Sequence, residues 1–258
     1  MIQEITSSDH KLVKKVASLK EKKYRERYGE FLVEGAHSVN WALSSLYEVR
    51  DLVFSDDFLM PEDLKENLDG RNLVKVPGHV FAKMADTKTP QGILCTCALP
   101  KAMPPSSGGR YIYCDRVSDP GNLGSIIRSA DALGFSGVML STCCVDPFNP
   151  KLVRSTMGSL FHVQLHMDVT PDKLAEMKVN GFQLIASALT NDSISLCDFA
   201  PEENLILVVG NEAKGVSEEI IQMADAVVKI PMAGSAESLN VAAAAAILMY
   251  EANAGRLA

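Results

Sequence analysis

Short apolar runs alternate with longer mixed segments along the chain, most regularly after Tyr111. The runs YIYC, VML, LIA, LILVV and VVKI have the length of buried strands, and the segments between them have the length of helices. This succession is typical of a parallel sheet with helices on both faces, whose ligands bind beyond the carboxyl ends of the strands. The expected strands are 111–114, 138–140, 161–165, 184–186, 205–209 and 227–230, and the expected helices are 122–133, 149–158, 171–179, 216–224 and 241–250.

The last expected helix, Val241–Tyr250, is an unbroken apolar run, so the sequence predicts a helix that is buried on every side. The loop before this helix carries Gly234, Glu237, Ser238 and Asn240. Exposed backbone N–H groups at such a helix start can hold an anionic or polar ligand. An ordinary capped turn before a core helix explains the same residues, and this stretch alone leaves both interpretations open.

The first hundred residues show a smaller α/β pattern. Strands are expected within 29–36 and near 49–54, 72–76 and 92–96, with helices near 61–67 and 78–85. The segment LPKAMPPSSGGR that follows gathers three prolines, two serines and two glycines, which is typical of a linker. We therefore expect a small domain over residues 1–98, a linker over 99–110 and a larger α/β domain over 111–258.

A basic helix is expected from Lys11 to Arg27. This segment holds eight Lys and Arg residues against two Glu residues, while apolar residues recur at helical spacing on one face. The positive face is either an ordinary solvated face or a surface that contacts phosphate groups. The residues proposed for phosphate or RNA contact are Lys22, Lys23, Arg25 and Arg27.

The overall composition limits the possible functions. The 258 residues carry a net charge of −7, so any binding of nucleic acid needs a local basic face. Six cysteines without a C-x-x-C pair indicate reduced, mostly buried thiols, and His162 and His166 lack further ligands at metal-binding spacing. The amino terminus lacks a signal-peptide core, and the longest uncharged apolar segment, Ser238–Tyr250, is too short to span a bilayer. We expect a cytoplasmic protein without a metal or a membrane contact.

Two further strand-end segments carry candidate chemistry. Asp115–Arg128 reads DRVSDPGNLGSIIR and opens a helix without the G-x-G-x-x-G spacing of dinucleotide-binding proteins. Leu205–Gly215 reads LILVVGNEAKG, where Glu212 could accept a proton or orient an arginine. Taken singly, the first is explained as a helix start with a surface arginine, and Asn211 and Glu212 are explained as caps of the next helix.

Together these segments resemble a known family. N-x-G-x-x-x-R at 122–128, G-N-E-x-x-G at 210–215 and I-P-M-x-G-x-x-E-S-L-N-V-A at 230–242 are similar to the three ordered motifs of the SpoU (TrmH-like) RNA ribose 2′-O-methyltransferases of the SPOUT superfamily. The resemblance covers residues 110–258. More loosely, Lys22–Ala42 and Thr87–Ile93 resemble the amino-terminal substrate-binding domain of that family, which is related to a ribosomal-protein fold.

The resemblance implies a SPOUT-type trefoil-knotted sheet, a homodimer with sites near the subunit interface, and S-adenosylmethionine as the cofactor. It implies transfer of the sulfonium methyl group to a ribose 2′-hydroxyl, a reaction that needs no metal. Carried over by motif, the residues expected to hold the cofactor are Ala188, Leu189, Gly210, Ile230, Met232 and Leu239.

The same resemblance implies that Arg128 is the principal catalytic residue. In that family this arginine is often written as the general base. Because a guanidinium does not give up its proton near neutral pH, we expect Arg128 first to bind phosphate and to stabilise the developing alkoxide, and either role predicts that its removal abolishes activity. Asn122, Glu212, Ser238 and Asn240 would support it, with Glu212 positioning Arg128 or a hydroxyl and with Ser238 and Asn240 ordering the loop.

An appended amino-terminal domain with a basic first helix resembles the ribosomal-RNA branch of that family more than the single-domain transfer-RNA branch, so the resemblance implies ribosomal RNA as the substrate. Three alternatives remain at this point: a transfer-RNA ribose methyltransferase, a non-catalytic RNA-binding or ribosome-assembly protein of the same fold, and an enzyme that methylates a base nitrogen.

Overall fold

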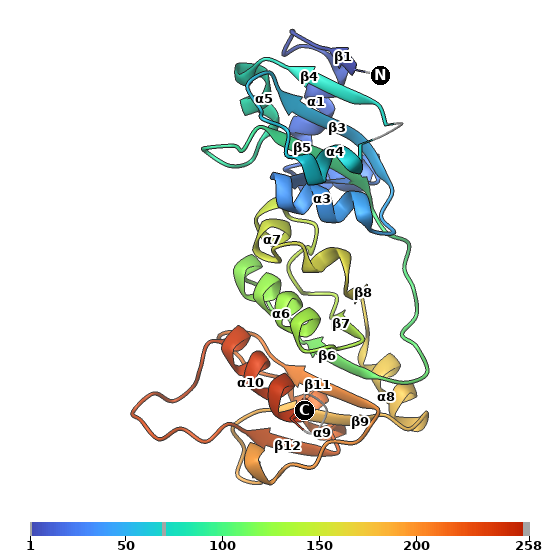
Figure 1. Ribbon diagram of the computed structural model, residues 1–258. Coiled ribbons are helices and arrows are strands. Elements are labelled where there is room, and N and C mark those ends of the chain that lie inside the picture. Colours follow the sequence, from blue (N-terminus) through green and yellow to red (C-terminus); the bar gives the residue numbers. More distant parts are fainter. Residues whose placement is uncertain (1, 69–70, 255–258) are drawn as a thin grey trace. The chain divides into compact units, whose positions relative to one another are not determined.

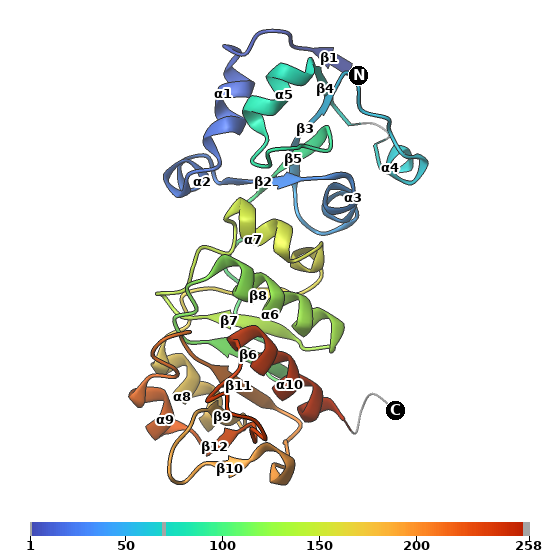
Figure 2. The same cartoon turned by 90° about the vertical axis from the view of Figure 1, so that its left-hand side faces the viewer.

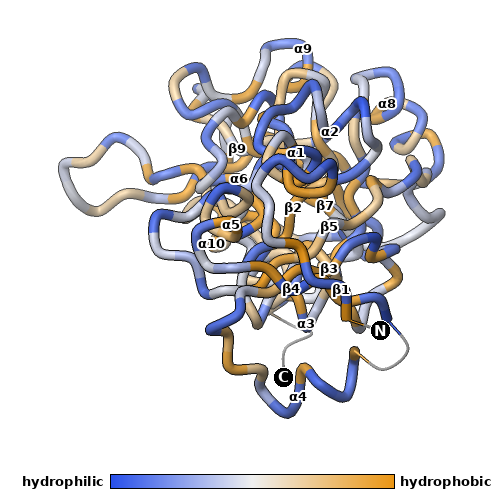
Figure 3. The backbone as a smooth tube through the Cα atoms, turned by 90° about the horizontal axis from the view of Figure 1, so that it is seen from above, coloured by the Kyte–Doolittle hydropathy of each residue, from blue (hydrophilic) through white to orange (hydrophobic). Residues whose placement is uncertain are grey.

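In the computed structural model, which describes residues 2–68 and 71–254, the chain divides into two units (Figure 1). The first unit comprises Met1–Lys101 and Asp146–His162, and the second comprises Ala102–Val145 and Val163–Ala258. Each unit has its own sheet. Figure 3 shows that hydrophobic residues concentrate on the strands, while many connecting loops are hydrophilic.

Among the described residues, the first unit contains a five-stranded mixed sheet in the order β1-β4-β3-β5-β2. Its strands are β1 (Ile2–Glu4), β2 (Glu30–Glu34), β3 (Val49–Ser55), β4 (Leu73–Val76) and β5 (Ile93–Ala98). Its helices are α1 (Lys11–Ser18), α2 (Lys22–Tyr28), α3 (Ala36–Ser44), α4 (Glu62–Glu66), α5 (Gly78–Met84), α7 (Pro150–Ser155) and the 3₁₀ helix η1 (Ser159–Phe161). Helices α1 and α5 pack together, and their apolar residues form one core with those of β3 and β4.

The single basic helix expected over 11–27 is wrong, because the structure has two helices with a break between them. The residue before α2, Glu21, is extended, with φ −99° and ψ 134°. The guanidinium of Arg25 reaches back and donates hydrogen bonds to the carbonyl oxygens of Leu19 and Lys20, at 2.8 and 2.9 Å. The side chain of Arg25 thus satisfies carbonyl groups at the break, a role that helical spacing does not reveal.

The segment Asp146–His162 belongs to the first unit, although the expected domain limits place it in the second. Helix α7 packs against β2, and the rings of Phe31 and Phe148 lie 4.8 Å apart between centroids. The strand expected over 161–165 also differs, because η1 ends at Phe161 and β8 begins only at Gln164. Both differences arise because this part of the chain packs on β2 rather than continuing the regular succession.

In the part of the chain that the structure describes, the second unit holds a seven-stranded sheet in the order β10-β12-β9-β11-β6-β7-β8, and every pair is parallel. The strands are β6 (Arg110–Cys114), β7 (Gly137–Leu140), β8 (Gln164–His166), β9 (Gln183–Ser187), β10 (Ile194–Ser195), β11 (Leu205–Val209) and β12 (Ala226–Lys229). The helices are α6 (Pro120–Ala132), α8 (Pro171–Val179), the 3₁₀ helix η2 (Leu196–Asp198), α9 (Glu218–Met223) and α10 (Val241–Asn253). The predicted parallel α/β sheet is confirmed.

The helices of this unit cover both faces of the sheet. Tyr111 and Tyr113 of β6 share a core with α8 and α9. Helices α6 and α10 contact each other on the opposite face (Figure 2), where Arg110 donates to the carbonyl of Ala252 and, at 2.6 Å, to Oδ1 of Asn253. The return of the chain from β12 to α10 through residues 230–240 is the segment that the predicted knot involves.

The prediction that α10 is buried on every side is wrong. Leu248 and Met249 are buried, but Ile247 and Tyr250 are 41% and 59% exposed, and Ala243 one helical turn before Ile247 is also exposed. The helix packs on α6, β11 and η2. An apolar stripe of α10 is therefore left uncovered by the part of the chain that the structure describes.

The cysteines follow the sequence prediction in part. Cys95, Cys97 and Cys114 are buried in strands, whereas Cys143 and Cys197 are exposed, and none of them forms a disulfide among the described residues. None of the helices described in the structure is long and apolar enough to cross a membrane.

Candidate functional site

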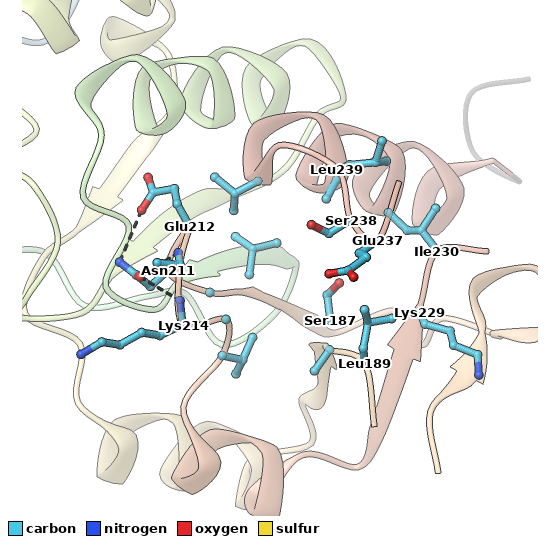
Figure 4. Close-up of a pocket in the computed structure, with 18 of the residues that line it drawn as sticks. Ser187, Leu189, Asn211, Glu212, Lys214, Lys229, Ile230, Glu237, Ser238 and Leu239 are labelled. Carbon is cyan, nitrogen blue, oxygen red and sulfur yellow. Dashed lines mark hydrogen bonds between the residues drawn. The ribbon is translucent and has the colours of Figure 1, made fainter. Parts of the chain in front are cut away.

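A cavity of about 760 Å³ opens at the carboxyl ends of the strands of the second unit. It is bounded by the loops that follow β9, β11 and β12 and by the start of α10 (Figure 4). This is the edge at which a parallel sheet is expected to bind its ligand. All of the residues predicted to hold a cofactor line it, namely Ala188, Leu189, Gly210, Ile230, Met232 and Leu239.

Gly210 is required by the way in which the next loop folds. Asn211 and Gly215 form two backbone hydrogen bonds with each other, at 3.0 and 2.8 Å, so the loop closes directly over Gly210. A Cβ atom at Gly210 would lie 2.0 Å from the carbonyl carbon of Gly215. The backbone therefore reaches the cavity without a side chain at this point. Gly234 differs, because a Cβ atom there would have no neighbour within 4 Å.

The carboxylate of Glu212 points away from the cavity (Figure 4) and binds the loop before α6. It accepts hydrogen bonds from the hydroxyl of Ser118 at 2.8 Å, from the backbone N–H of Asp119 at 3.0 Å and from Nδ2 of Asn122 at 3.0 Å. Partial burial opposes ionisation, but the hydrogen bonds from Asn122 and Asp119 outweigh it and lower the pKa of Glu212 to about 2. Glu212 is thus a carboxylate at neutral pH that holds this loop, and among the described residues no hydrogen bond or ion pair joins it to Arg128.

Asn122 and Asn240 connect the loop before α6 to the start of α10. Nδ2 of Asn240 donates to Oδ1 of Asn122 at 2.9 Å, while Oδ1 of Asn240 accepts from the backbone N–H of Ala242 at 2.9 Å. Asn240 is therefore both the cap of α10 and a contact between motifs. Glu212, Asn122 and Asn240 form one continuous set of hydrogen bonds, which we call the motif network.

Arg128 lies outside the cavity of its own chain. It is exposed on α6, and among the described residues its side chain makes no hydrogen bond or ion pair. Ser238 lines the cavity, and Figure 4 shows Ser187 and Glu237 directed toward each other within it, while Lys214 and Lys229 project outward. A single copy of the chain thus brings together all predicted site residues of the second unit except Arg128.

Some contacts of the site were not predicted from the sequence. Ser118 and Asp119 bind Glu212, and Oδ1 of Asp119 also accepts from the backbone N–H of Asn122 at 2.8 Å, which caps α6. The signal was present, because Asp before Pro120 is a typical start of a helix. No group of three or more His, Cys, Asp or Glu among the described residues is placed to hold a metal ion.

The basic residues of the first unit are not equivalent. Lys22, Lys23 and Arg27 are exposed on α2, as a phosphate contact requires. Arg25 is only 3% exposed, and its Nε donates to Oδ2 of Asp146 at 3.0 Å. This burial removes Arg25 from the set of residues that RNA can reach, because its guanidinium is already bound within the unit.

Comparison with known proteins agrees with this geometry. The model of the SpoU rRNA Methylase family matches residues 109–250, and that of the MRM3-like substrate binding domain matches residues 10–95. A 23S rRNA guanosine 2′-O-methyltransferase of Bacillus subtilis is 35% identical over 96% of this chain and 98% of its own. The crystal structure of an AdoMet-bound rRNA methyltransferase from Sinorhizobium meliloti has a TM-score of 0.89 at 32% identity, covering 100% of this chain and 99% of its own.

Some of the structural matches cover only part of this chain. The TrmH/SpoU tRNA modifying enzyme of A. aeolicus is 31% identical and has a TM-score of 0.50, covering 57% of this chain and 75% of its own.

Proposed function

The chain belongs to the SpoU rRNA methylase family, and we propose that it is an S-adenosylmethionine-dependent methyltransferase that acts on a ribose 2′-hydroxyl of ribosomal RNA. The observation that carries this proposal is the motif network at the edge of the cavity, where three segments far apart in sequence are joined by hydrogen bonds. The match to the B. subtilis enzyme extends over nearly the whole chain, whereas the tRNA enzyme matches little more than half. Ribosomal RNA is therefore favoured over transfer RNA.

The residues that line the cavity suit this cofactor. Leu189, Met232 and Leu239 offer apolar surface to an adenine ring, and Gly210 lets the backbone approach. The carboxylate of Glu237 within the same cavity suits the positive charge of a sulfonium or an amino group. When bound, S-adenosylmethionine supplies the methyl group as an electrophile that needs no metal.

The chain itself has to bind and activate the ribose hydroxyl. A guanidinium group is too weak an acid to serve as a base at neutral pH, so we assign Arg128 no role in removing the hydroxyl proton. A guanidinium can instead bind a neighbouring phosphate by two hydrogen bonds and stabilise the negative charge that develops on the 2′-oxygen. The motif network fixes the loops that bound the cavity while this charge develops.

A second copy of the chain would complete the site. Arg128 lies outside its own cavity, and α6, which carries it, packs beside α10, whose exposed stripe consists of Ala243, Ile247 and Tyr250. We expect this stripe to be covered in a homodimer, so that Arg128 of one copy serves the cavity of the other. Replacement Ile247→Asp should shift the mass measured by analytical ultracentrifugation from dimer to monomer and abolish methyl transfer. A wild-type chain that is monomeric at micromolar concentration would contradict this arrangement.

The reaction is tested with labelled S-adenosylmethionine and deproteinised ribosomal RNA, and transfer RNA serves as the comparison. We expect label in ribosomal RNA, at a linkage that has become resistant to alkaline hydrolysis because its 2′-hydroxyl is methylated. Digestion to nucleosides separates a methylated ribose from a methylated base. Label only in transfer RNA, or only in a base, would overturn the proposal.

Calorimetry with S-adenosylmethionine distinguishes the enzyme from a non-catalytic protein of the same fold. Absence of binding at millimolar cofactor would favour the RNA-binding or ribosome-assembly alternative. The cytoplasmic location remains the prediction from the sequence.

A further inference from the structure

We propose that a groove between α1 and α2 of the first unit binds an unpaired segment of RNA, with a base stacked on Tyr28 and phosphates held by Lys11 and Lys14. The groove has a volume of about 750 Å³ and is lined by residues of α1 on one side and by Tyr24 and Tyr28 of α2 on the other. We call it the tyrosine groove. The inference rests on the proposed function in one respect, which is that the substrate is RNA.

The two tyrosines form a partly exposed aromatic surface outside the core, with Tyr28 exposed and Tyr24 half-buried. Tyr24 and Tyr28 lie one helical turn apart, with ring centroids 6.4 Å apart and planes inclined by 20°, and Tyr28 is 40% exposed. Nζ of Lys23 lies over the ring of Tyr24, 4.8 Å from its centroid, and the guanidinium carbon of Arg27 lies over the ring of Tyr28, 5.7 Å from its centroid. Aromatic rings with cations close to them are typical of the surfaces on which proteins stack unpaired bases.

The burial of Arg25 explains how Tyr24 and Tyr28 can face the tyrosine groove rather than the core. Its buried guanidinium holds α2 to the unit through Asp146 and the carbonyl groups of the helix break. Because the side chain of Arg25 anchors this short helix, Tyr24 and Tyr28 can turn toward the groove.

The lysines of the groove differ in their availability. Lys15 is held by Glu30 and Asp51 at 2.8 and 2.6 Å, so it contributes little to binding. Lys14 pairs with Asp9, but their side chains are 63% and 84% exposed, and such ion pairs are weak and easily exchanged for a phosphate. Lys11 is exposed and has no ion pair among the described residues.

The local charge supports a polyanion as the ligand. From residue 9 to residue 28 the chain carries eight Lys and Arg against three Asp and Glu, although its net charge is −7. An acidic peptide would satisfy the lysines but would not need the rings, and a duplex would hide its bases from them. The combination of rings and lysines therefore favours a single strand.

The first test uses a fluorescein-labelled 12-nucleotide oligouridylate and fluorescence anisotropy with the full chain. Tyr28→Ala should weaken binding roughly 5- to 160-fold, which corresponds to the 1–3 kcal/mol lost when a stacking aromatic residue is removed. Tyr28→Phe keeps the ring and should bind within about twofold of the wild type. Equal losses in both variants, or none in Tyr28→Ala, would overturn the stacking role, and circular dichroism establishes that each variant is folded.

The second test measures the salt dependence of the same binding. Replacing both Lys11 and Lys14 by Ala should make the plot of log affinity against log salt shallower by roughly 1.4, since each contact to a single strand contributes about 0.7. Lys65→Ala is the matched control, because Lys65 is an exposed lysine of the same unit that pairs only with Glu62 in the described chain, and the slope should not change. An unchanged slope in the double variant would overturn the phosphate contacts.

The outcomes separate this inference from the proposed function. If the wild type methylates ribosomal RNA but does not bind the oligonucleotide, the tyrosine groove is wrong and the activity stands. If it binds the oligonucleotide through Tyr28 but transfers no methyl group, the groove stands and the activity is wrong. Competition by oligoglutamate that is equal in the wild type and in Tyr28→Ala would identify an acidic peptide as the ligand and overturn the inference.

Discussion

The basic segment of the first unit and the motif loops of the second unit are both rich in polar residues, but the structure uses them in opposite ways. In the motif loops, polar side chains bind one another, and Arg128 remains exposed without a partner among the described residues. In the basic segment, Arg25 is buried against Asp146 while most of its neighbours face solvent. Arg128 and Arg25 both lie on helices, but Arg128 is exposed and Arg25 is buried. The difference is that Asp146, which is distant in the sequence, packs against Arg25.

The largest effect on the motif loops is expected from Gly210→Ala. The added Cβ would lie 2.0 Å from backbone, which cannot relax as a side chain can, so the loop must move. We expect the folded state to lose about 3 kcal/mol of stability. Cofactor binding should no longer be measurable. Gly234→Ala is the control, because open space surrounds that position, and calorimetry should find its cofactor affinity unchanged. Normal binding by Gly210→Ala would show that the loop is more tolerant than its geometry indicates.

Arg128→Ala tests whether an arginine without a partner is a functional one. Loss of a group that stabilises developing charge typically costs 10²- to 10³-fold in rate, so methyl transfer should fall by about that factor. The affinity for S-adenosylmethionine should stay within about twofold, because we expect Arg128 to contact the RNA phosphate and the 2′-oxygen rather than the cofactor. Arg50→Ala, an exposed arginine of the first unit, is the control. Wild-type turnover in Arg128→Ala would remove this residue from the reaction.

Arg25→Ala tests the opposite expectation, that a buried arginine is structural. The change leaves Asp146 without its partner and exposes carbonyl groups at the helix break, which should cost about 3 kcal/mol of folding free energy. Denaturant unfolding measures this loss, and Arg27→Ala, two residues away and exposed, should change stability by less than about 0.5 kcal/mol. Equal losses of folding free energy in Arg25→Ala and Arg27→Ala would contradict the structural role of the buried arginine.

The smallest effect concerns the pH dependence of the Glu212 contacts. The pKa of Glu212 is about 2 in the folded chain, below its ordinary value of 4.5, so its contribution to stability is complete above pH 4.5 and declines as the pH falls toward 2. The difference in melting temperature between the wild type and Glu212→Gln should therefore be constant from pH 7 to 5 and shrink below pH 4.5. A difference that grows on acidification would contradict this sign.

The sequence predicted the second unit better than the first, for physical reasons. Buried parallel strands are nearly continuous apolar runs, and LILVV coincides with β11 residue for residue. Ordered motifs at strand ends located Gly210, Glu212 and Asn240, because parallel strands bring their carboxyl ends to one edge. The exposed stripe of α10 was missed because Ile247 and Tyr250 are apolar whether a helix is covered by its own chain or by another.

The first unit shows the opposite limitation. The break between α1 and α2 contains no Gly or Pro, and it depends on the side chain of Arg25, so helical spacing gives no sign of it. The partner that buries Arg25 lies 121 residues along the chain. The spacing of apolar residues predicts helices and strands. It does not identify which distant segment of the chain packs against them.

The membership of Asp146–His162 in the first unit has a consequence for biosynthesis. During translation, β2 emerges well before Phe148 and α7, which pack against it. Phe31, which is fully buried in the finished unit, therefore lacks the ring of Phe148 until the chain has grown past half its length. An expression fragment that ends at residue 101 would likewise expose this apolar surface, which favours aggregation. A useful fragment of the first unit needs residues 146–162 supplied in the same chain or as a second peptide.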